Sequence, residues 1–370
     1  MLKGGYFLCS CNLQCFVECL TISYNFSCSV FMSIQKRKKD HVDLCVNDDV
    51  SYETPTGFDQ YYFRHNALPE VNLEDVSVEG TLLGRSFSFP LMISSMTGGY
   101  SDAGQINAQI ARYCESENLP FGVGSQRALL DHPEEIESFS IVREEAPTAF
   151  IAANIGGAQV AGGLSDTQIS ILVESVKADA IIVHLNPLQE LVQPEGDRKF
   201  AGVEDGISRL VNESPVPVIV KETGAGISGG VARRLLATGV SVIDVAGSGG
   251  TSWSKVENKR KDDSESTEMF NEWGIPTQTC VQEVAELREQ FRFELIASGG
   301  ISGAADIVKS HCLGADFAAS ARPVIQALMN GGEEELHLLI SRWKEQTAII
   351  LALLGRRSLQ ECSTKDLGNK

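Results

Sequence analysis

The sequence predicts an α/β fold, a (β/α)8 TIM barrel, from the pattern of its apolar runs. Eight short apolar runs recur along the chain, with helix-like segments between them. Strands of a parallel sheet are buried on both faces, so they are continuously apolar rather than alternating. Eight such strands, each followed by a helix, close into a barrel. The expected strands are Phe89–Met96, Phe121–Ser125, Ala149–Ile155, Ala180–Asn186, Val216–Glu222, Val240–Ala246, Glu294–Ser298 and Asp316–Ala321.

The segments between these strands have the spacing of amphipathic helices. Ile169, Leu172 and Val173 recur as on one face of a helix. Ser165, with Gln168 three residues later, predicts a capping box at the start of that helix. A doubly wound sheet is the competing fold, but it usually has about five or six strands, and no Gly-x-Gly-x-x-Gly follows the first strand here. The barrel is therefore favoured.

The composition excludes several classes of protein. The chain has 370 residues, of which 43% are hydrophobic, and a formal net charge of −18. Nucleic acid binding needs concentrated Lys and Arg to neutralise phosphates, so no nucleic acid partner is expected. No apolar stretch approaches the roughly 20 residues that span a bilayer, so no membrane partner is expected either. An anionic small molecule remains compatible, because a few basic residues in a cleft reverse the local sign of the potential.

The beginning of the chain fits no targeting pattern. Its apolar stretch is interrupted by Asn12, Gln14 and Glu18, which a signal peptide would not contain. We expect residues 1–33 to be an N-terminal extension, disordered or non-native, and residues 34–370 to form the barrel. The cysteines after Met32 show neither metal-ligand spacing nor an even disulfide framework, which suits a reducing cytoplasm.

A long polar segment interrupts the regular spacing at about residues 251–279. A loop of this length inside a compact domain is usually a lid or is disordered. Its charges, among them Lys255, Glu257 and Arg260, are equally compatible with a solvated excursion that has no role. Trp253 and Trp273 lie near its ends and are interpreted as docking points.

Polar residues follow the fourth expected strand directly. His184, Asn186, Gln189 and Glu190 stand at its carboxyl end, where Pro187 stops the strand because it has no N–H to donate. Catalysis in α/β barrels occurs at this rim. A carboxylate, two amides and an imidazole suffice to hold a hard cation and move a proton. The alternative is that these side chains only cap the next helix.

Glycine clusters follow six of the eight strands, as in the segments 122–124 and 247–250. Glycine at a strand end lets backbone N–H groups approach a phosphate or a flat ring. The recurrence predicts a large, planar, phosphorylated cofactor, and flavin mononucleotide (FMN) fits best. Lys221 would place positive charge beside the pyrimidine edge of the flavin. Polar ring contacts are expected from Thr97, Ser125, Asn154 and Thr251, and phosphate contacts from Gly300, Ala321 and Arg322.

From about Ile34 to Leu354 the chain resembles the type 2, FMN-dependent isopentenyl diphosphate isomerases. The run His184-Leu185-Asn186-Pro187-Leu188-Gln189-Glu190 is highly specific, whereas the Gly-rich turns are shared with other FMN barrels. Ser302 is a departure, because many relatives have Arg after the Gly-Gly-Ile turn, and this puts the phosphate contact there in doubt. The other matching motifs are Arg37-Lys38-Lys39-Asp40-His41, Met96-Thr97-Gly98-Gly99, Gly124-Ser125-Gln126-Arg127, Lys221-Glu222, Gly249-Gly250-Thr251-Ser252-Trp253 and Ser298-Gly299-Gly300-Ile301.

The resemblance implies interconversion of isopentenyl and dimethylallyl diphosphate, with reduced FMN, Mg²⁺ and NADPH as the reductant of the flavin. Glu190 is implied as the metal ligand, and Gln189 and His184 as catalytic residues. A homo-oligomer, a tetramer or an octamer, is also implied. The implied substrate-binding residues are Arg37, Lys38, Ser125, Arg127, Asn186 and Gln189, and the implied cofactor-binding residues are Met96, Thr97, Gly98, Ser125, Asn154, Lys221, Thr251, Gly300, Ser302, Ala321 and Arg322.

Two other functions remain open from the sequence. An FMN-dependent oxidoreductase of the 2-hydroxy acid oxidase type needs a histidine base and arginines at the rim, and His311 is the only histidine after the fifth strand and before the eighth. A purine nucleotide dehydrogenase would need a cysteine in the loop Gly247–Thr251, which has none. The second function is that of a flavin-binding protein without catalysis. The basic run that includes Arg37 and Lys38 could equally be a solvated start of the chain.

Overall fold

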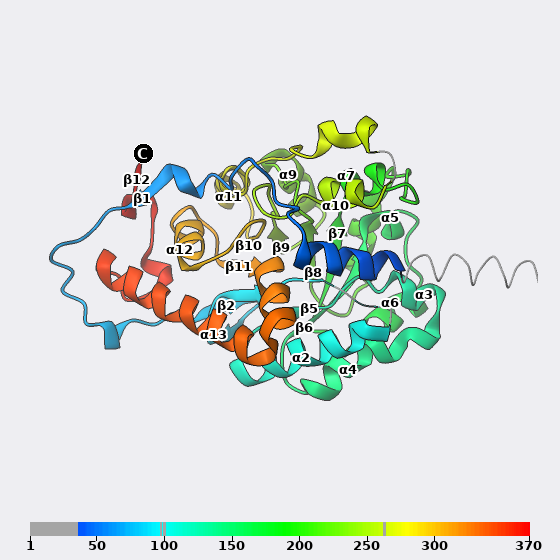
Figure 1. The fold of residues 1–370 in the computed structure, drawn as a ribbon, viewed down its shortest axis with the longest axis horizontal. Coiled ribbons are helices and arrows are strands. Elements are labelled where there is room, and N and C mark those ends of the chain that lie inside the picture. The colour runs from blue at the N-terminus through cyan, green and yellow to red at the C-terminus, as the bar shows by residue number, and fades with distance from the viewer. Residues whose placement is uncertain (1–35, 97, 99–100, 262–263) are drawn as a thin grey trace, which may run out of the picture.

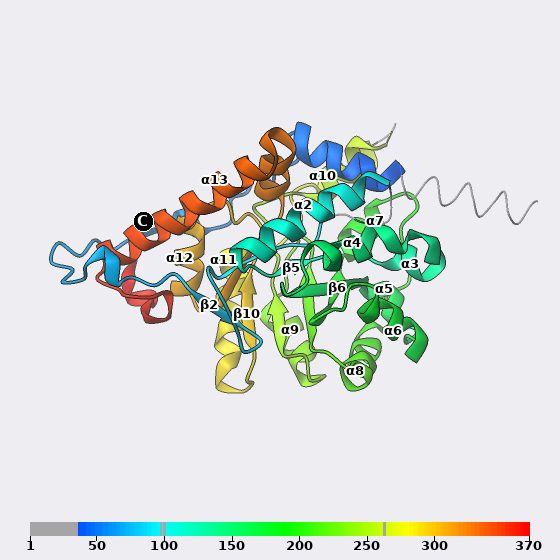
Figure 2. The same cartoon turned by 90° about the horizontal axis from the view of Figure 1, so that it is seen from below.

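A computed structural model describes residues 36–96, 98, 101–261 and 264–370. Eight parallel strands form a closed barrel in which the carboxyl ends of all strands point to one mouth (Figures 1 and 2). The predicted fold class is confirmed, and each of the eight expected runs overlaps one strand. The barrel strands are β4 (Leu91–Ile93), β5 (Phe121–Gly122), β6 (Ile151–Gly156), β7 (Ala180–Leu185), β8 (Val218–Glu222), β9 (Val242–Asp244), β10 (Glu294–Ala297) and β11 (Phe317–Ser320).

The order of the strands follows the chain, and β11 pairs with β4 to close the barrel. The register brings His184 of β7 beside Lys221 of β8, and Lys221 beside Asp244 of β9. Three titratable residues from three neighbouring strands therefore lie at one level of the barrel, near the mouth.

Helices surround the barrel and bury their apolar faces against it (Figure 2). The predicted capping box is present: the Ser165 hydroxyl accepts from the N–H of Gln168, whose side chain accepts from the N–H of Ser165. The helices are α2 (Ser101–Glu117), α3 (Arg127–Asp131), α4 (Glu137–Glu145), α5 (Gly157–Val160), α6 (Asp166–Glu174), α7 (Pro187–Val192), α8 (Val203–Glu213), α9 (Gly229–Ala237), α10 (Trp253–Lys259), α11 (Thr277–Ala285), α12 (Ala304–Cys312) and α13 (Arg322–Leu354).

A hairpin of β2 (Gly80–Leu82) and β3 (Arg85–Phe87) closes the end of the barrel opposite the mouth. Leu82 and Phe87 of this hairpin pack with the side chains inside the barrel, including Met92, Ile182 and Phe317. The interior is thus filled by apolar side chains, as in other barrels of this class, and is not a pore. The mouth is the open end.

Further segments extend the barrel. A helix over residues 36–47, blue in Figure 1, crosses the barrel on the side of α10 and the start of α13. Strand β1 (Tyr61–Phe63) pairs antiparallel with β12 (Leu367–Asn369), which joins the chain's last residues to its first third. Among the described residues, no helix is long and apolar enough to cross a membrane.

The long segment between β9 and β10 is folded where the structure describes it. Its residues 251–279 contain α10, a 3-10 helix over Glu265–Phe270 and the start of α11. Ser254 of α10 is fully buried, and the Ser252 side chain accepts from the N–H of Lys255 at the start of this helix. The two tryptophans differ: Trp253 lines the mouth, whereas Trp273 is 61% exposed.

Candidate active site

Two adjoining cavities open at the mouth of the barrel. The larger, of about 370 Å³, lies over the ends of β4, β8, β9, β10 and β11 and is called the first cavity here. The second cavity, of about 160 Å³, lies over the ends of β5, β6 and β7. Both cavities are lined by the same six residues where they meet: His41, Ser95, Met96, Lys221, Thr223 and Trp253.

The first cavity ends at the N-terminus of α13. Ala321, Arg322 and Pro323 line it there, beside Gly300 and Ser302 of the loop after β10. Backbone N–H groups at a helix N-terminus and the helix dipole together favour an anion. This end lies after the seventh and eighth barrel strands, the usual phosphate-binding place of such barrels.

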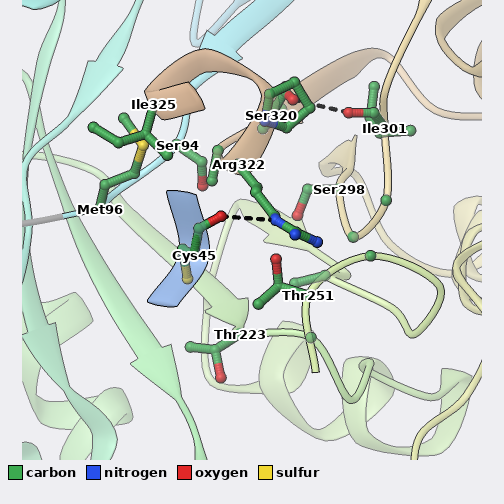
Figure 3. Close-up of a pocket in the computed structure, with 18 of the residues that line it drawn as sticks. Cys45, Ser94, Met96, Thr223, Thr251, Ser298, Ile301, Ser320, Arg322 and Ile325 are labelled. Atoms are coloured by element: carbon green, nitrogen blue, oxygen red, sulfur yellow. Dashed lines mark hydrogen bonds between the residues drawn. The ribbon is translucent and has the colours of Figure 1, made fainter. Parts of the chain in front are cut away.

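Arg322 also anchors the chain that covers the cavity (Figure 3). Its guanidinium donates to the carbonyl oxygens of Cys45 and Asp48 at 2.9 and 2.7 Å, and to the Ser51 hydroxyl at 2.6 Å. Residues 45–51 are therefore fixed over the first cavity, which Cys45 and Ser51 help to line. The prediction assigned Arg322 to a phosphate alone, and the structure adds this second set of contacts.

The glycines of this rim serve close packing between loops. A Cβ at Gly299 would lie 2.0 Å from the carbonyl oxygen of Gly247, and one at Gly250 would lie 2.4 Å from the nitrogen of Gly300. Gly300 has a φ of +78°, which also disfavours a side chain. The sequence analysis predicted that these glycines let the backbone approach a cofactor. Their immediate neighbours are the glycines of the adjacent loop. The close contact between the two loops is therefore the direct reason why these positions are glycine.

The second cavity is polar and gathers the predicted substrate residues. Lys38 donates to the carbonyl oxygen of Ser125 at 3.3 Å, and Arg127 forms an ion pair with Asp197 at 2.8 Å. Ser125 and Asn154 were predicted to contact the cofactor ring. They line the second cavity and not the first, which is the larger one. Thr97 lies outside the described residues. The predicted residues that line this cavity are Arg37, Lys38, Met96, Gly98, Ser125, Arg127, Asn154, His184, Asn186, Gln189, Glu190 and Lys221.

Glu190 offers a carboxylate in an oxygen-rich corner. The side-chain amide of Asn186 donates to Oε1 of Glu190 at 3.1 Å and to Oε1 of Gln189 at 3.2 Å, and the N–H of Asp197 donates to Oε2 of Glu190 at 2.6 Å. A carboxylate has about four lone-pair sites, so Glu190 retains acceptor capacity. Carboxylate and amide oxygens are the donor set that suits Mg²⁺.

His184 is held as a neutral imidazole. Its Nδ1 donates to Oδ1 of Asn154 at 2.7 Å. Burial, with Lys221 and Lys38 adding to it, lowers the pKa of His184 to about 3. At neutral pH this imidazole is uncharged, so it offers a hydrogen bond rather than a positive charge.

Glu257 contacts residues that line the mouth and belongs to the charged segment for which the sequence left both a lid and a solvated excursion open. Its side chain is fully buried and accepts from Nε2 of His41 at 2.9 Å, from Nε2 of Gln189 at 3.0 Å and from Arg260 at 2.5 Å. Burial alone would raise the pKa of Glu257, but its contacts with His41, Gln189 and Arg260 outweigh it and lower the pKa to about 2. The carboxylate is therefore charged at neutral pH.

Gln193 links Glu257 to the basic run. With its amide oriented to suit both neighbours, Gln193 donates to Oε1 of Glu257 at 3.0 Å and accepts from Nη1 of Arg37 at 2.8 Å. Burial lowers the pKa of Arg37, and the nearby carboxylates of Glu195, Glu257 and Glu190 oppose that shift. Arg37 and Lys38 therefore lie at the mouth, which favours the substrate-binding interpretation over a solvated start.

Asp244 and Glu222 are also buried at the strand ends and were not predicted. Asp244 is a charged residue inside the expected run Val240–Ala246, and a carboxylate within an apolar run was the signal that could have found it. Glu222 accepts from the N–H groups of Thr223, Gly224, Ala225 and Gly226, and so shapes the loop after β8.

Comparison with known proteins shows the family of the chain. Residues 184–369 match the model of the FMN-dependent dehydrogenase family. The isopentenyl-diphosphate delta-isomerase of Chlorobium luteolum is 48% identical over 349 residues, which cover 90% of this chain and 96% of the relative. The enzyme of the same name from a Nostoc species is 42% identical over 331 residues, covering 88% and 93%. The chain belongs to the isopentenyl-diphosphate delta-isomerase family.

Solved structures share the fold of this family member at low identity. A flavocytochrome b2 variant has a TM-score of 0.65 and 19% identity, covering 90% of this chain and 82% of that one. A lactate oxidase of Pediococcus acidilactici has a TM-score of 0.64 and 15% identity, covering 92% and 94%. At these identities the likeness concerns the barrel alone.

Proposed function

We propose that the protein converts isopentenyl diphosphate to dimethylallyl diphosphate by a 1,3-allylic proton shift, with reduced FMN and Mg²⁺, in isoprenoid biosynthesis. The observation that carries the proposal is the junction of the two cavities. A space of cofactor size with a helix N-terminus at one end adjoins a polar space lined by Arg37, Lys38 and Glu190. Family membership at up to 48% identity supports the same activity.

The residues of the first cavity fit FMN. Its volume of about 370 Å³ lies within the range of roughly 300–1,000 Å³ of ligand pockets. Gly300, Ser302, Ala321 and Arg322 would hold the phosphate at the start of α13, and Lys221, Met96 and Thr251 would contact the ring. When bound in its reduced form, FMN supplies a group that exchanges a proton with the alkene and stabilises positive charge, with no net redox change.

The residues of the second cavity fit a diphosphate and its metal ion. Arg37 and Lys38 would hold the phosphates, since a guanidinium contacts phosphate oxygens in a bidentate way. Arg127 and Ser125, which also line this cavity, would add polar contacts. Glu190 would bind Mg²⁺, which keeps several waters and takes one carboxylate together with substrate phosphates. Asn186 fixes the Glu190 carboxylate by its hydrogen bond.

Gln189 and His184 are proposed to act on the proton. The amide of Gln189 is fixed at both ends, since it donates to Glu257 and accepts from Asn186. A fixed amide beside the junction directs the movement of a proton near the alkene. His184, which is neutral, donates through Nδ1 to Asn154 and so leaves Nε2 as an acceptor. Closure by the helix of residues 36–47 would exclude water.

The alternative is an FMN-dependent oxidoreductase of the 2-hydroxy acid oxidase type. It would require a titrating base at the rim, yet the described imidazoles that line the two cavities belong to His41 and His184. The pKa of His184 is lowered by burial to about 3, so this imidazole is too weak a base to take a proton from a hydroxy acid near neutral pH. Membership of the isopentenyl-diphosphate delta-isomerase family, with relatives up to 48% identical, favours the isomerase.

One assay tests the proposal. The purified protein is incubated with isopentenyl diphosphate, FMN, Mg²⁺ and either NADPH or dithionite, and product is followed by NMR. We expect dimethylallyl diphosphate with NADPH used only to reduce the flavin. NADPH consumed in proportion to product would instead indicate an oxidoreductase, and bound FMN without product would indicate a binding protein.

The remaining expectations belong to the same proposal. NADPH is proposed as the reductant, and a homo-oligomer, tetramer or octamer, as the assembled form. A cytoplasmic location is supported by the free thiols of Cys45, Cys114, Cys280, Cys312 and Cys362. The division into an extension of residues 1–33 and a barrel of residues 34–370 with an insertion at 251–279 is likewise proposed. The extension lies outside the described residues.

A further inference from the structure

Asp244 does not line the first cavity, but it contacts three residues that do. The carboxylate ends β9 and is 3% exposed. The Ser298 hydroxyl donates to Oδ1 at 2.5 Å, and the ammonium nitrogen of Lys221 lies 3.9 Å from Oδ2. The N–H of Ala246 also donates to the carboxylate. Lys221, Ala246 and Ser298 all line the cavity, so Asp244 lies behind its wall.

The backbone beside Asp244 depends on this carboxylate. Ala246 has a φ of +38°, in the left-handed region that a residue with a Cβ rarely adopts. An aspartate side chain that accepts from the N–H two residues later stabilises such a turn. Asp244 therefore holds both the shape of the wall at Ala246 and the direction of Lys221.

Lys221 and Asp244 interact mainly with each other, because the neighbouring titratable side chains are either neutral or directed elsewhere. The imidazole of His184 beside Lys221 is neutral at physiological pH, because burial lowers its pKa to about 3. Glu222 directs Oε2 to four backbone N–H groups of the next loop, and Lys221 also donates to the Glu222 carbonyl oxygen. The side chains of Lys221 and Asp244 are 9% and 4% exposed, so little solvent screens their interaction.

We propose that Asp244 is a positioning residue that compensates the charge of Lys221 and keeps the net charge beside the flavin close to zero. This inference rests on the proposed binding of FMN in the first cavity. An uncompensated cation next to the ring would stabilise an anionic reduced flavin. A neutral pair avoids that bias, and suits a reaction in which the reduced ring must take up and return a proton without losing electrons.

The test compares the midpoint potential of bound FMN in four proteins: the parent, Asp244→Asn, Lys221→Met and the double variant. Each is reduced stepwise by dithionite with a reference dye. Asp244→Asn leaves Lys221 alone, so the ratio of reduced to oxidised FMN at a fixed potential should rise at least tenfold, which is about 30 mV for a two-electron couple. Asp366→Asn is the control, because this buried carboxylate lines neither cavity.

Lys221→Met gives the second, independent reading. Burial raises the pKa of Asp244 and Lys221 opposes that rise, so loss of the cation favours proton uptake by the carboxyl, which would keep the net charge. The ratio should change by less than tenfold, and Asp244→Asn should add nothing in this background. An unchanged potential in Asp244→Asn, an equal rise in both backgrounds, or a fall of more than tenfold in Lys221→Met each overturns the inference.

Flavin content, measured first, separates the two claims. A parent protein that does not bind FMN would defeat the proposed function and this inference together. A parent that binds FMN and forms product, but shows one of the contrary potentials, would defeat the role of Asp244 alone. If Asp244→Asn fails to fold, the Lys221→Met measurement still decides.

Discussion

Nε2 of His41 lies 2.9 Å from a carboxylate oxygen of Glu257, a residue 216 positions away in the chain. The carboxylate is ionised at neutral pH, so the imidazole donates this hydrogen bond. The same oxygen accepts from Gln189. One buried side chain therefore joins the helix of residues 36–47, which carries Arg37 and Lys38, to the proposed proton-transfer residue at the barrel rim.

Glu257→Gln should impair catalysis, because Glu257 connects the helix of residues 36–47 to Gln189. The substitution removes the charge from hydrogen bonds to His41, Gln189 and Arg260, each of which contributes about 1.5–3 kcal/mol when charged. We expect kcat/KM to fall roughly thirtyfold, which corresponds to about 2 kcal/mol. Steady-state kinetics with isopentenyl diphosphate measures the change. The exposed Glu268 of the same insertion is the matched control, and an equal loss in Glu268→Gln would contradict the role of the junction.

The basic run predicts a difference between neighbouring residues. Arg37 and Lys38 line the second cavity, whereas Lys36 is exposed. Arg37→Ala and Lys38→Ala should each raise the KM for the diphosphate about tenfold or more, because each loses a charge-assisted contact with phosphate. Lys36→Ala should leave the KM unchanged. Equal KM values in all three variants would show that the basic run is a solvated segment that does not bind the substrate.

The sequence predicted the barrel well because its signals are local. Each buried strand is a short apolar run, and each run can be recognised without its neighbours. Lys221 was found in this way, as a charge directly after such a run. Asp244 lies inside the run Val240–Ala246, with two apolar residues after it, so the same rule does not find it.

Glu257 could not be placed from the sequence. It lies in a run of Lys, Arg, Asp and Glu whose pattern is typical of a solvated surface, and only the tertiary fold turns this one carboxylate toward His41. The role of the glycines also could not be read from the sequence alone. Their positions after the strands were recognised, but the contact between Gly247 and Gly299 that requires them joins two separate loops.

Glu190→Gln tests the metal site. The amide keeps the size of the side chain and one oxygen, but it loses the charge that Mg²⁺ prefers. We expect a higher Mg²⁺ concentration for half-maximal activity and lower activity at saturation, with FMN still bound, because Glu190 lines only the second of the two cavities. A Mg²⁺ titration with flavin absorbance as the control measures both. An unchanged titration curve would remove Glu190 from the metal site.

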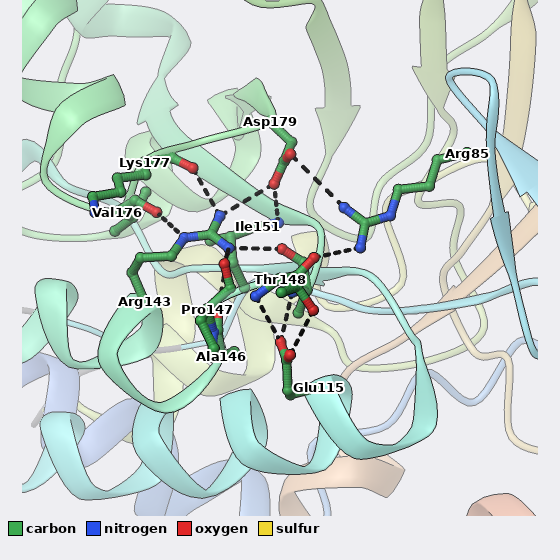
Figure 4. A network of polar contacts seen from close by, with 11 residues as sticks. Arg85, Glu115, Arg143, Ala146, Pro147, Thr148, Ile151, Val176, Lys177 and Asp179 are labelled. Atoms are coloured by element: carbon green, nitrogen blue, oxygen red, sulfur yellow. Dashed lines mark hydrogen bonds and ion pairs between the residues drawn. The ribbon is translucent and has the colours of Figure 1, made fainter.

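Arg143→Met should destabilise the protein without touching the mouth. Arg143 joins the segments that enter β6 and β7, far from the carboxyl ends of these strands (Figure 4). Its side chain is 13% exposed, and it also forms an ion pair with Asp179 at 3.2 Å. Its guanidinium donates to the carbonyl oxygens of Val176, Ala146, Ala149 and Lys177 at 3.0, 3.0, 2.9 and 2.7 Å.

Removing the guanidinium leaves several carbonyl oxygens, three of them in partly buried contacts, without this donor, so we expect the free energy of unfolding to fall by about 2–4 kcal/mol. Urea denaturation measures this loss, and KM for the diphosphate should not change. The exposed Arg209 donates to one carbonyl oxygen, that of Ala161. Arg209→Met should therefore cost less than about 1 kcal/mol. Equal losses in the two variants would show that the network contributes no special stability.

His184 predicts a specific dependence of stability on acid. Its pKa is lowered by burial to about 3 in the folded protein, against about 6.5 in an unfolded chain. Between these values the unfolded state binds more protons, so stability rises with pH and is lost as the pH falls from about 6.5 toward 3. At pH 5 the loss from this residue should be about 2 kcal/mol relative to pH 8.

His184→Asn removes that titration and keeps a donor for Asn154. The difference in unfolding free energy between pH 8 and pH 5, measured by urea denaturation, should therefore be about 2 kcal/mol smaller in this variant than in the parent. His65 is exposed, so His65→Asn should leave the difference unchanged. If the acid loss is the same in all three proteins, His184 is charged or solvated in the folded state, and its proposed role as a neutral hydrogen-bonding group at the mouth fails with it.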